Sequence, residues 1–358
     1  ASRKDALALA ASGQAGIIIG THALLGQSVN FADLGLIVVD EQHRFGVEQR
    51  DALKAKAGLP PHVLVMTATP IPRTVAMTVF GDLDVSTLRE LPRGRQQITT
   101  HVVDAVEKPA FVERAWTRIR EEVAKGHQAY VVAPRINASA SSDADMDFLF
   151  GTTSTELTSV EELAPKLHSD QLSGLRLAIM HGQLSSDVKD ETMQAFAQGK
   201  IDVLVTTTVI EVGVDVPNAT VMVIMDADRF GVSQLHQLRG RIGRGTSPGL
   251  CILVTSAPAE SSARARLDAV ASTIDGFELS RIDLEQRREG DVLGVSQSGT
   301  RSHLRLLRVL RDEDLIDHAR SDAQALIESD PDLSSSPALA KELAILQSDE
   351  AADYIDKG

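Results

Sequence analysis

Two adjacent carboxylates, Asp40 and Glu41, follow directly after an apolar run in the segment LIVVDEQHRFG, which occupies residues 36–46. The four aliphatic residues before them have the length and the branching of a buried strand. Ligands of open parallel sheets bind at the carboxyl ends of the strands, so both acids are placed to reach a bound metal and a water. A hard cation such as Mg²⁺ keeps most of its waters, and one or two carboxylates hold it beside a nucleotide phosphate. An acidic turn after an ordinary strand is the alternative, and for so short a motif alone it is the more frequent one.

Positively charged side chains gather in a second segment, from Arg229 to Gly245, which carries four arginines and no acidic residue. The whole chain has a formal net charge of −14, so this local excess of positive charge is the feature that suits a phosphate. Two of the arginines, Arg241 and Arg244, stand in the glycine-rich sequence GRIGRG. A solvated basic loop is the alternative, and it accounts for the charge but not for the three glycines.

Hydroxyl side chains follow several of the other apolar runs, at the positions where a parallel sheet places its strand ends. They occur in the segments GTHALL, MTATPIPRT and TTTVIEVGVDVP, and the residues of interest are Thr21 with its neighbour His22, Thr67, Thr69, Thr206 and Thr207. Hydroxyls and main-chain N–H groups at strand ends bind phosphate oxygens without reading a base sequence. Ordinary capping of the strand ends is the alternative, and the local sequence does not separate the two.

The composition is that of a globular protein with a sizeable core. The chain has 358 residues, of which 43% are hydrophobic and 24% charged, and this is enough for two domains and a smaller third one. Aromatic residues make up only 3%, which disfavours base stacking as a mode of nucleic-acid binding. Cys251 is the single cysteine, so a disulfide framework and a cysteine-based zinc site are excluded. No run is apolar enough to span a bilayer and no signal peptide opens the chain, so we expect a cytoplasmic protein without membrane contact.

The elements that must position these side chains alternate between apolar strands and amphipathic helices, which is typical of α/β folds with parallel sheets. We expect strands at 16–20, 36–39, 63–66, 99–103, 129–133, 177–180, 203–206, 219–225 and 250–254. We expect helices at 2–12, 50–57, 108–125, from 160, and at 187–197, 261–272, 277–288, 312–328 and 339–346. The Ser/Thr/Asp-rich stretch 138–159 interrupts this pattern and predicts a surface insertion.

The order of these motifs across two α/β units resembles that of superfamily 2 helicases. The segments GTHALL, DEQHRFGVEQR, MTATPIPRT, MHGQLSSDVKDETMQAF and VIEVGVDVPNA resemble the RecG family of branch-migration helicases in wording as well. The resemblance covers nearly the whole chain. It implies an α/β fold of two RecA-like parallel-sheet domains, the first truncated at its N-terminus, followed by a mainly helical C-terminal region.

The resemblance also implies a division into domains. Residues 1–90 would form part of helicase domain 1, 91–97 a linker, 98–260 helicase domain 2, and 261–358 a helical region. No GxxxxGK[ST] sequence occurs, so the loop that cradles the β- and γ-phosphates is missing from this chain. We therefore expect the C-terminal part of a RecG-like helicase, which begins within domain 1 and does not hydrolyse ATP on its own.

ATP and Mg²⁺ are the ligands that this resemblance implies. Asp40 would hold Mg²⁺ through water and Glu41 would orient the attacking water, because phosphoryl transfer depends on the metal and on positioning more than on covalent chemistry. Gln42 and His43 would report the state of the nucleotide to the second domain. The alternative for His43 is a hydrogen-bonded structural histidine.

The second RecA-like domain would supply the remaining nucleotide contacts. Arg241 and Arg244 stand where this superfamily places arginine fingers, which stabilise charge on the γ-phosphoryl group. Gln237 belongs to the same motif. Gly213 and Asp215 belong to another, in which the aspartate contacts the ribose or a hydrogen-bond network that couples the domains.

Residues 277–299 resemble the TRG segment shared by RecG and the Mfd translocase, in which a helical hairpin and a loop couple motor closure to movement along duplex DNA. Arg287, Arg288 and Gln297 fall at its marked positions. Val295 and Ser296 stand where the family often has Thr-Arg. The threonine-containing strand ends would contact the DNA backbone.

The expected function is therefore that of a fragment of an ATP-dependent translocase on double-stranded DNA. The full-length protein would remodel stalled replication forks and Holliday junctions in recombination and repair, and would act as a monomer on branched DNA. A fragment of an Mfd-like transcription-repair coupling translocase is one alternative. The RREGDVLG sequence and the short C-terminus favour the RecG family over it. A motor-dead nucleic-acid-binding module is the other.

Overall fold

The structure is a computed structural model that describes residues 3–26, 29–40, 60–67, 86–88, 96–137, 157–211, 215–286 and 313–348. The chain divides into two compact units, residues 87–292 and residues 1–86 with 293–358. The helix expected at 50–57 lies outside the described residues, as do most of the expected linker and of the insertion at 138–159.

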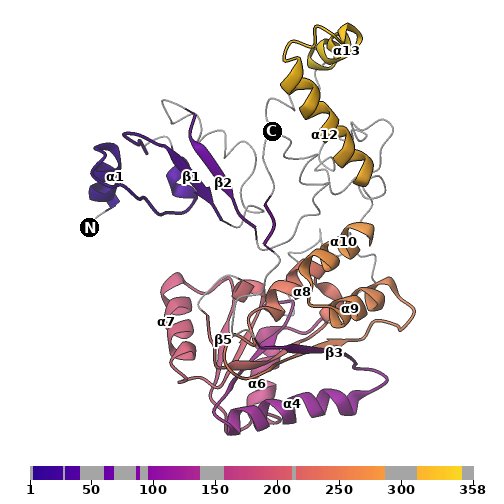
Figure 1. Cartoon of the computed structure of the whole chain (residues 1–358). Helices are drawn as coiled ribbons and strands as arrows, with labels where there is room; N and C mark the ends of the chain where they lie inside the picture. Colours follow the sequence, from indigo (N-terminus) through magenta and orange to yellow (C-terminus); the bar gives the residue numbers. More distant parts are fainter. Residues whose placement is uncertain are drawn as a thin grey trace. The chain divides into compact units, whose positions relative to one another are not determined.

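A six-stranded parallel sheet forms the centre of the unit 87–292 (Figure 1). Its strands follow the order β3-β8-β7-β4-β6-β5, and every neighbouring pair is parallel. The bounds are β3 Ile98–Asp104, β4 Gln128–Val132, β5 Leu177–Met180, β6 Val203–Thr206, β7 Ala219–Ile224 and β8 Gly249–Thr255. All six strands were predicted to within one residue at each end, and the predicted α/β class with a parallel sheet is confirmed.

Helices cover both faces of this sheet, as parallel crossovers require (Figure 1). One face carries α4 Pro109–Ala124 and α6 Val160–Ser169. The other carries α7 Ser186–Ala197, α8 Val232–Arg239, α9 Ser262–Ser272 and α10 Gly276–Gln286, together with the short 3₁₀ turns Thr208–Glu211 and Ala227–Arg229. Serine caps begin two of these helices, because Ser185 Oγ accepts the Val188 N–H at 3.4 Å and Ser261 Oγ accepts that of Arg264 at 3.2 Å.

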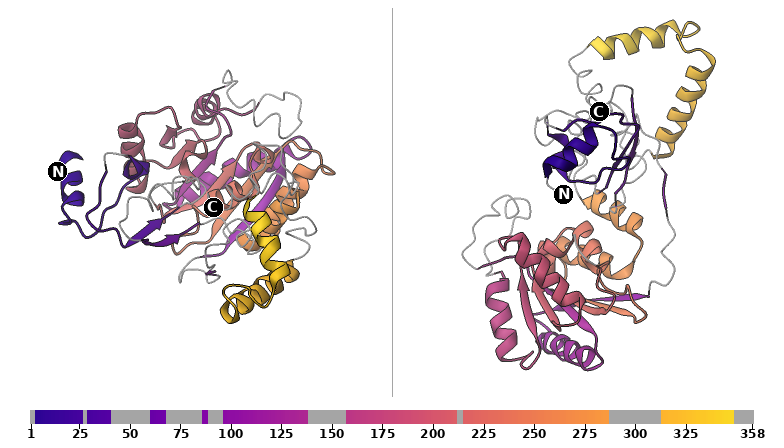
Figure 2. Two further views of the ribbon diagram at one scale, coloured as in Figure 1. Left: turned by 90° about the horizontal axis from the view of Figure 1, so that it is seen from above. Right: turned by 90° about the vertical axis from the view of Figure 1, so that its left-hand side faces the viewer.

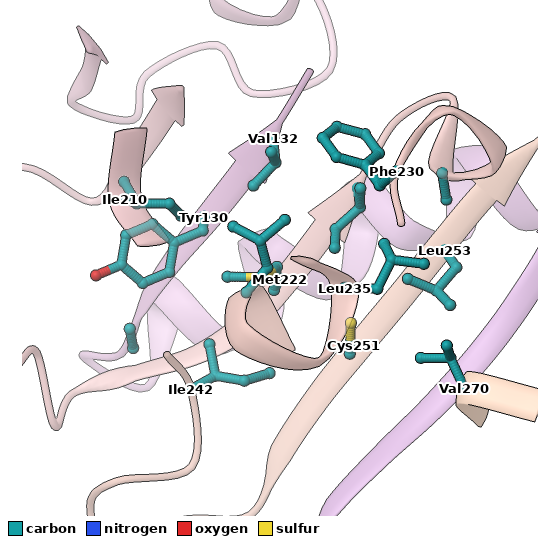
Figure 3. Packing of buried hydrophobic residues seen from close by; sticks show 14 of the residues in the cluster. Tyr130, Val132, Ile210, Met222, Phe230, Leu235, Ile242, Cys251, Leu253 and Val270 are labelled. Carbon is teal, nitrogen blue, oxygen red and sulfur yellow. The ribbon is translucent and has the colours of Figure 1, made fainter. Parts of the chain in front are cut away.

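The core lies on both sides of the central strands. Every residue of β4, β6 and β7 is buried, which is the pattern of parallel strands between two helical layers. Figure 3 shows the cluster on the α8 side, where Tyr130, Met222 and Cys251 from three strands pack near Leu235 of α8 and Val270 of α9. The ring of Tyr130 also meets that of Phe196 on α7, with ring centroids 5.0 Å apart.

In the described part of the smaller unit, two strands form a parallel pair. After α1 Arg3–Ala11 and the 3₁₀ turn His22–Leu25, β1 Leu36–Val39 pairs with β2 His62–Val65. Ile37 and Val39 are buried against Phe31, Leu34 and the alternate residues of β2. The helix predicted at 2–12 and the strands predicted at 36–39 and 63–66 are confirmed, the last with its start and end one residue earlier.

The strand predicted at 16–20 is wrong. These residues have no regular structure, and Ile17 and Ile19 are 85% and 93% exposed. A strand needs a hydrogen-bonded neighbour, and within the described part of the chain no strand pairs with this run. The run has the residue types of a strand, but among the described residues it has no neighbouring strand to pair with.

The last described residues form two helices, α12 Glu313–Ser329 and α13 Pro337–Ser348, which confirm the helices predicted there (Figure 2). A turn centred on Asp330 joins them: its carboxylate accepts hydrogen bonds from the N–H and hydroxyl groups of Ser335 and Ser334. These bonds, those of Ser335 first, lower the pKa of Asp330 to about 2. None of the described helices combines the length and the apolar character needed to cross a bilayer.

Candidate functional site

Asp40 and Thr67 both follow their strands at the carboxyl edge of the β1–β2 pair. Val39 is in register with Val65, and the Met66 N–H donates to the Val39 carbonyl at 2.8 Å, so Asp40 directly follows β1 at the edge where Thr67 follows β2 by two residues. Asp40 and Thr67 are both exposed there. An exposed carboxylate at a strand end is the hard oxygen ligand that fits Mg²⁺ beside a phosphate.

Other residues predicted for this edge are described only in part or not at all. Glu41, Gln42, His43 and Thr69 lie outside the described residues. Thr21 is exposed and precedes the 3₁₀ turn that begins at His22, whose backbone alone is described. Nothing in the described geometry therefore tests the roles predicted for these residues.

The arginine loop, residues 240–245, connects the end of α8 to β8 in the larger unit. Arg244 forms an ion pair with Asp215 through Nη1, and its Nε donates to the Gly240 carbonyl at 2.9 Å. The side chain of Asp215 is 60% exposed and that of Arg244 is 28% exposed. The structure thus brings together two residues predicted for the nucleotide, but in contact with each other.

Both arginines of the loop act on the buried Tyr130 of β4. Burial raises the pKa of the Tyr130 hydroxyl to about 12, although the positive charges of Arg241 and Arg244 oppose that shift. Sequence reasoning missed Tyr130, whose only signal was a hydroxyl-bearing ring within the apolar strand QAYVV.

The glycines of the loop are explained by its backbone. Gly243 has a φ of +68°, and a Cβ at this position would lie 2.9 Å from Ile98 Cγ1. A Cβ on Gly245 would lie 2.4 Å from the Pro217 carbonyl oxygen. Glycine is therefore the residue that fits at each of these two positions. A freely solvated basic loop would have no such steric requirement for glycine.

Arg239, another of the four arginines in this region, is unavailable to a ligand. It is 2% exposed, and its Nη1 donates to the carbonyls of Val270 and Thr273, the latter at 2.9 Å. Its Nη2 lies 3.0 Å from His236 Nδ1. Arg239 therefore fastens α8 to the end of α9, which the sequence alone did not indicate.

Thr206 is fully buried at the end of β6, and its hydroxyl donates to the Thr207 carbonyl at 3.0 Å. This bond is what the alternative of ordinary strand-end capping predicts, and the DNA contact expected of Thr206 stays a prediction. Thr207 is 6% exposed, and its N–H donates to the Met180 carbonyl at 3.3 Å.

The remaining predicted residues fall into two groups. Gln237 lies half-buried on α8, one turn before the arginine loop. Helix α10 packs against α8 and α9 with Leu279 buried, which places the start of the predicted coupling segment beside the arginine-bearing helix. Gly213, Arg287, Arg288 and Gln297 lie outside the described residues.

Family models match three successive parts of the chain. Residues 1–78 match the DEAD/DEAH box helicase family, and residues 116–246 match the helicase conserved C-terminal domain. Residues 273–348 match domain 3, C-terminal, of the ATP-dependent DNA helicase RecG. The first two matches contain the Asp40 edge and the arginine loop, respectively.

Similar proteins agree with these matches. The ATP-dependent DNA helicase RecG of Mycobacterium tuberculosis is 57% identical over 357 residues, which are 99% of this chain and 47% of that protein. RecG of Bacillus subtilis is 44% identical over 329 residues, 92% of this chain and 45% of that protein. A solved structure of RecG bound to a three-way DNA junction is similar with a TM-score of 0.63 and 36% identity, covering 88% of this chain and 38% of that one. The chain spans about half the length of these curated relatives, and it belongs to the RecG family of DNA helicases.

Proposed function

We propose that this chain is part of an ATP-dependent translocase on double-stranded DNA that remodels branched DNA at stalled forks and Holliday junctions. One observation carries this proposal. Asp40 at the end of β1 lies in the part that matches the DEAD/DEAH box family, and the arginine loop, whose backbone requires glycine at 243 and 245, lies in the part that matches the helicase C-terminal domain. The likeness to a RecG structure bound to a three-way junction supports branched DNA as the substrate. The match to RecG domain 3 favours RecG over the Mfd-like alternative.

The first part would position the metal and the attacking water. When bound, Mg²⁺ neutralises charge on the phosphates, and Asp40 offers it an exposed oxygen ligand. Glu41 would orient the water, and Gln42 and His43 would sense the nucleotide. These roles follow from the order of the residues after β1 and from the family.

The second part would act on the γ-phosphate through the arginine loop. Arg241 and Arg244 provide the positive charge, and Gly213, Asp215 and Gln237 complete the nucleotide side. Arg244 pairs with the carboxylate of Asp215, and in this proposal a phosphate would take the place of that carboxylate. An arginine suits such an exchange, since its planar fork binds either group.

DNA would contact Thr21, His22, Thr67 and Thr69 in the first part, Thr206 and Thr207 in the second, and the TRG-like segment. Arg287, Arg288 and Gln297 would couple closure of the motor to movement. We further propose a monomeric, cytoplasmic protein with the domain division 1–90, 91–97, 98–260 and 261–358.

The proposal is tested by ATP hydrolysis of the full-length protein in the presence of branched DNA. We expect DNA-stimulated turnover that Glu41→Gln abolishes, while the variant still binds ATP and DNA because Asp40 remains to hold Mg²⁺. The present chain contains no GxxxxGK[ST] sequence and should not turn over ATP. Turnover by this chain that Glu41→Gln removes would contradict that expectation, and a full-length protein without DNA-stimulated ATPase would refute the proposed function.

A further inference from the structure

A buried carboxylate at the end of α4 begins a hydrogen-bond chain that neither the motifs nor the proposed function uses. Glu122 is 5% exposed. Its Oε1 accepts from Lys125 Nζ at 2.7 Å and pairs with Arg118 Nη2 at 3.0 Å. Its Oε2 accepts from Thr220 Oγ1 of β7 at 3.2 Å and faces His127 Nδ1 at 2.7 Å. The carboxylate therefore links α4, the start of β4 and β7.

The chain continues through His127 to a serine beyond the arginine loop. Burial alone would raise the pKa of Glu122, but the bonds from Lys125 and His127, the charge of Arg118 and the Thr220 hydroxyl lower it to about 2. A carboxylate accepts only, so His127 Nδ1 must donate to it. In the neutral ring, Nε2 then accepts, and Ser247 Oγ lies 3.2 Å from it.

Ser247 follows Arg244 by three residues and precedes β8 by two. The loop before it is fastened on its other sides. The Gly243 carbonyl accepts the Gln96 N–H at 3.2 Å, and Gly245 packs against Pro217. After Ser247, the Gly249 N–H donates to the Gln97 carbonyl at 3.0 Å as β8 begins. The contact between Ser247 and His127 thus links the end of the arginine loop, through side chains, to the start of β4.

We propose that Glu122, His127 and Ser247 are positioning residues, which hold the backbone of the arginine loop in the conformation needed for ATP hydrolysis. The inference rests on the proposed function, since only there does the loop act on a phosphate. The order serine–histidine–carboxylate is also that of a hydrolytic triad. Here two cations already balance the charge of Glu122, which leaves little of it to stabilise an imidazolium. Positioning is therefore the role that fits.

The decisive comparison is Ser247→Thr against Ser247→Val in the full-length protein. Threonine and valine have nearly the same shape, and only threonine keeps the hydroxyl that reaches His127. We expect Ser247→Val to lower kcat about fivefold, the factor that one net hydrogen bond provides, with KM for ATP unchanged. Ser247→Thr should retain the wild-type kcat. Ser272→Ala is the matched control, because its hydroxyl bonds only to the Ala269 carbonyl on α9.

Two further measurements separate positioning from stability and from the proposed function. Amide hydrogen exchange across residues 240–248 of the present chain should be faster in Ser247→Val than in Ser247→Thr, with equal melting temperatures. His127→Ala combined with Ser247→Ala should lower kcat no further than His127→Ala alone. Equal kcat and equal exchange in the valine and threonine variants would overturn the inference, as would a fall of kcat only in step with melting temperature. Absent ATPase in the wild-type protein would instead refute the proposed function, and the exchange comparison would still decide the positioning.

Discussion

Arg244 is held at two points of its guanidinium group: Nη1 pairs with the carboxylate of Asp215, and Nε donates to the carbonyl of Gly240. The first partner lies at the surface and the second within the same loop. In the function proposed above, a γ-phosphate would take the place of the Asp215 carboxylate, while the bond to Gly240 orients the guanidinium group.

Replacement of Arg244 by lysine should test this arrangement. A lysine has one ammonium group in place of the fork, so it cannot bond to Gly240 and to an anion in the same way. We expect Arg244→Lys to lower kcat of the full-length protein by about 10³-fold, the lower end for arginine fingers in GTPases. Arg114→Lys on the exposed side of α4 is the control and should leave kcat unchanged. A loss of ATP affinity as large as the loss of turnover would argue that Arg244 acts in binding alone.

The backbone of the arginine loop should not tolerate a side chain at Gly243. Gly243→Ala would place Cβ against Ile98 at a φ of +68°, whereas Gly199 has a φ of +72° with no atom within 4 Å of its would-be Cβ. In both alanine variants the left-handed backbone conformation should lower the free energy of unfolding by about 1–2 kcal/mol. In Gly243→Ala the contact with Ile98 should lower it further, and denaturant unfolding measures the difference. Equal losses in the two variants would show that the contact with Ile98 is relieved at no cost.

Arg239 should be a stability residue. Arg239→Met would leave the carbonyls of Val270 and Thr273 without their donor in a buried place. We expect the free energy of unfolding to fall by about 2–3 kcal/mol. Arg114→Met removes a surface ion pair and should cost less than about 1 kcal/mol. The fluorescence of Trp116, the single tryptophan and 4% exposed, reports the unfolding of this unit.

The Glu122 network predicts a specific acid dependence of stability. The folded pKa of Glu122, about 2, lies below the ordinary 4.5, so the unfolded chain binds the proton more readily. The stabilisation is complete above pH 4.5 and is lost as the pH falls toward 2. Denaturant midpoints of wild type and Glu122→Gln should therefore differ most near pH 6 and converge only as the pH falls to about 2. A difference that is constant with pH would assign the effect to shape rather than charge. Because Asp104 and Asp202 also have lowered pKa values, only the difference between the two proteins is diagnostic.

Cys251 should be inert in the folded protein. It is fully buried in β8, and burial raises the pKa of its thiol to about 12 against the opposing charge of Arg239. A thiol reagent at pH 8 should leave the native chain unmodified and react once it unfolds. Because the sequence has one cysteine, the reaction rate reports the opening of this core directly. Rapid modification of the native chain would contradict the packing in Figure 3.

Most of the secondary structure and the fold class could be predicted from the amino-acid sequence alone. Strands such as 203–206 and 177–180 agree residue for residue, because an unbroken apolar run between polar turns has few alternatives to a buried parallel strand. Asp40 and Thr67 were placed at strand ends for the same reason, and the register of β1 and β2 puts them at one edge. The motif order was likewise readable in the sequence, and it indicated the RecG family.

Which of these side chains are exposed, and what they contact, could not be predicted without the packing of the elements. Arg239 and Arg244 look alike in the sequence, yet one is buried between two helices and the other meets Asp215 at the surface. The run at 16–20 has the composition of a strand but no neighbour to pair with. His127 and Ser247 lie 120 residues apart and touch only because β4 and β8 belong to one sheet. Local sequence sets the periodicity of an element, whereas burial, pairing and such distant contacts depend on how separate elements pack.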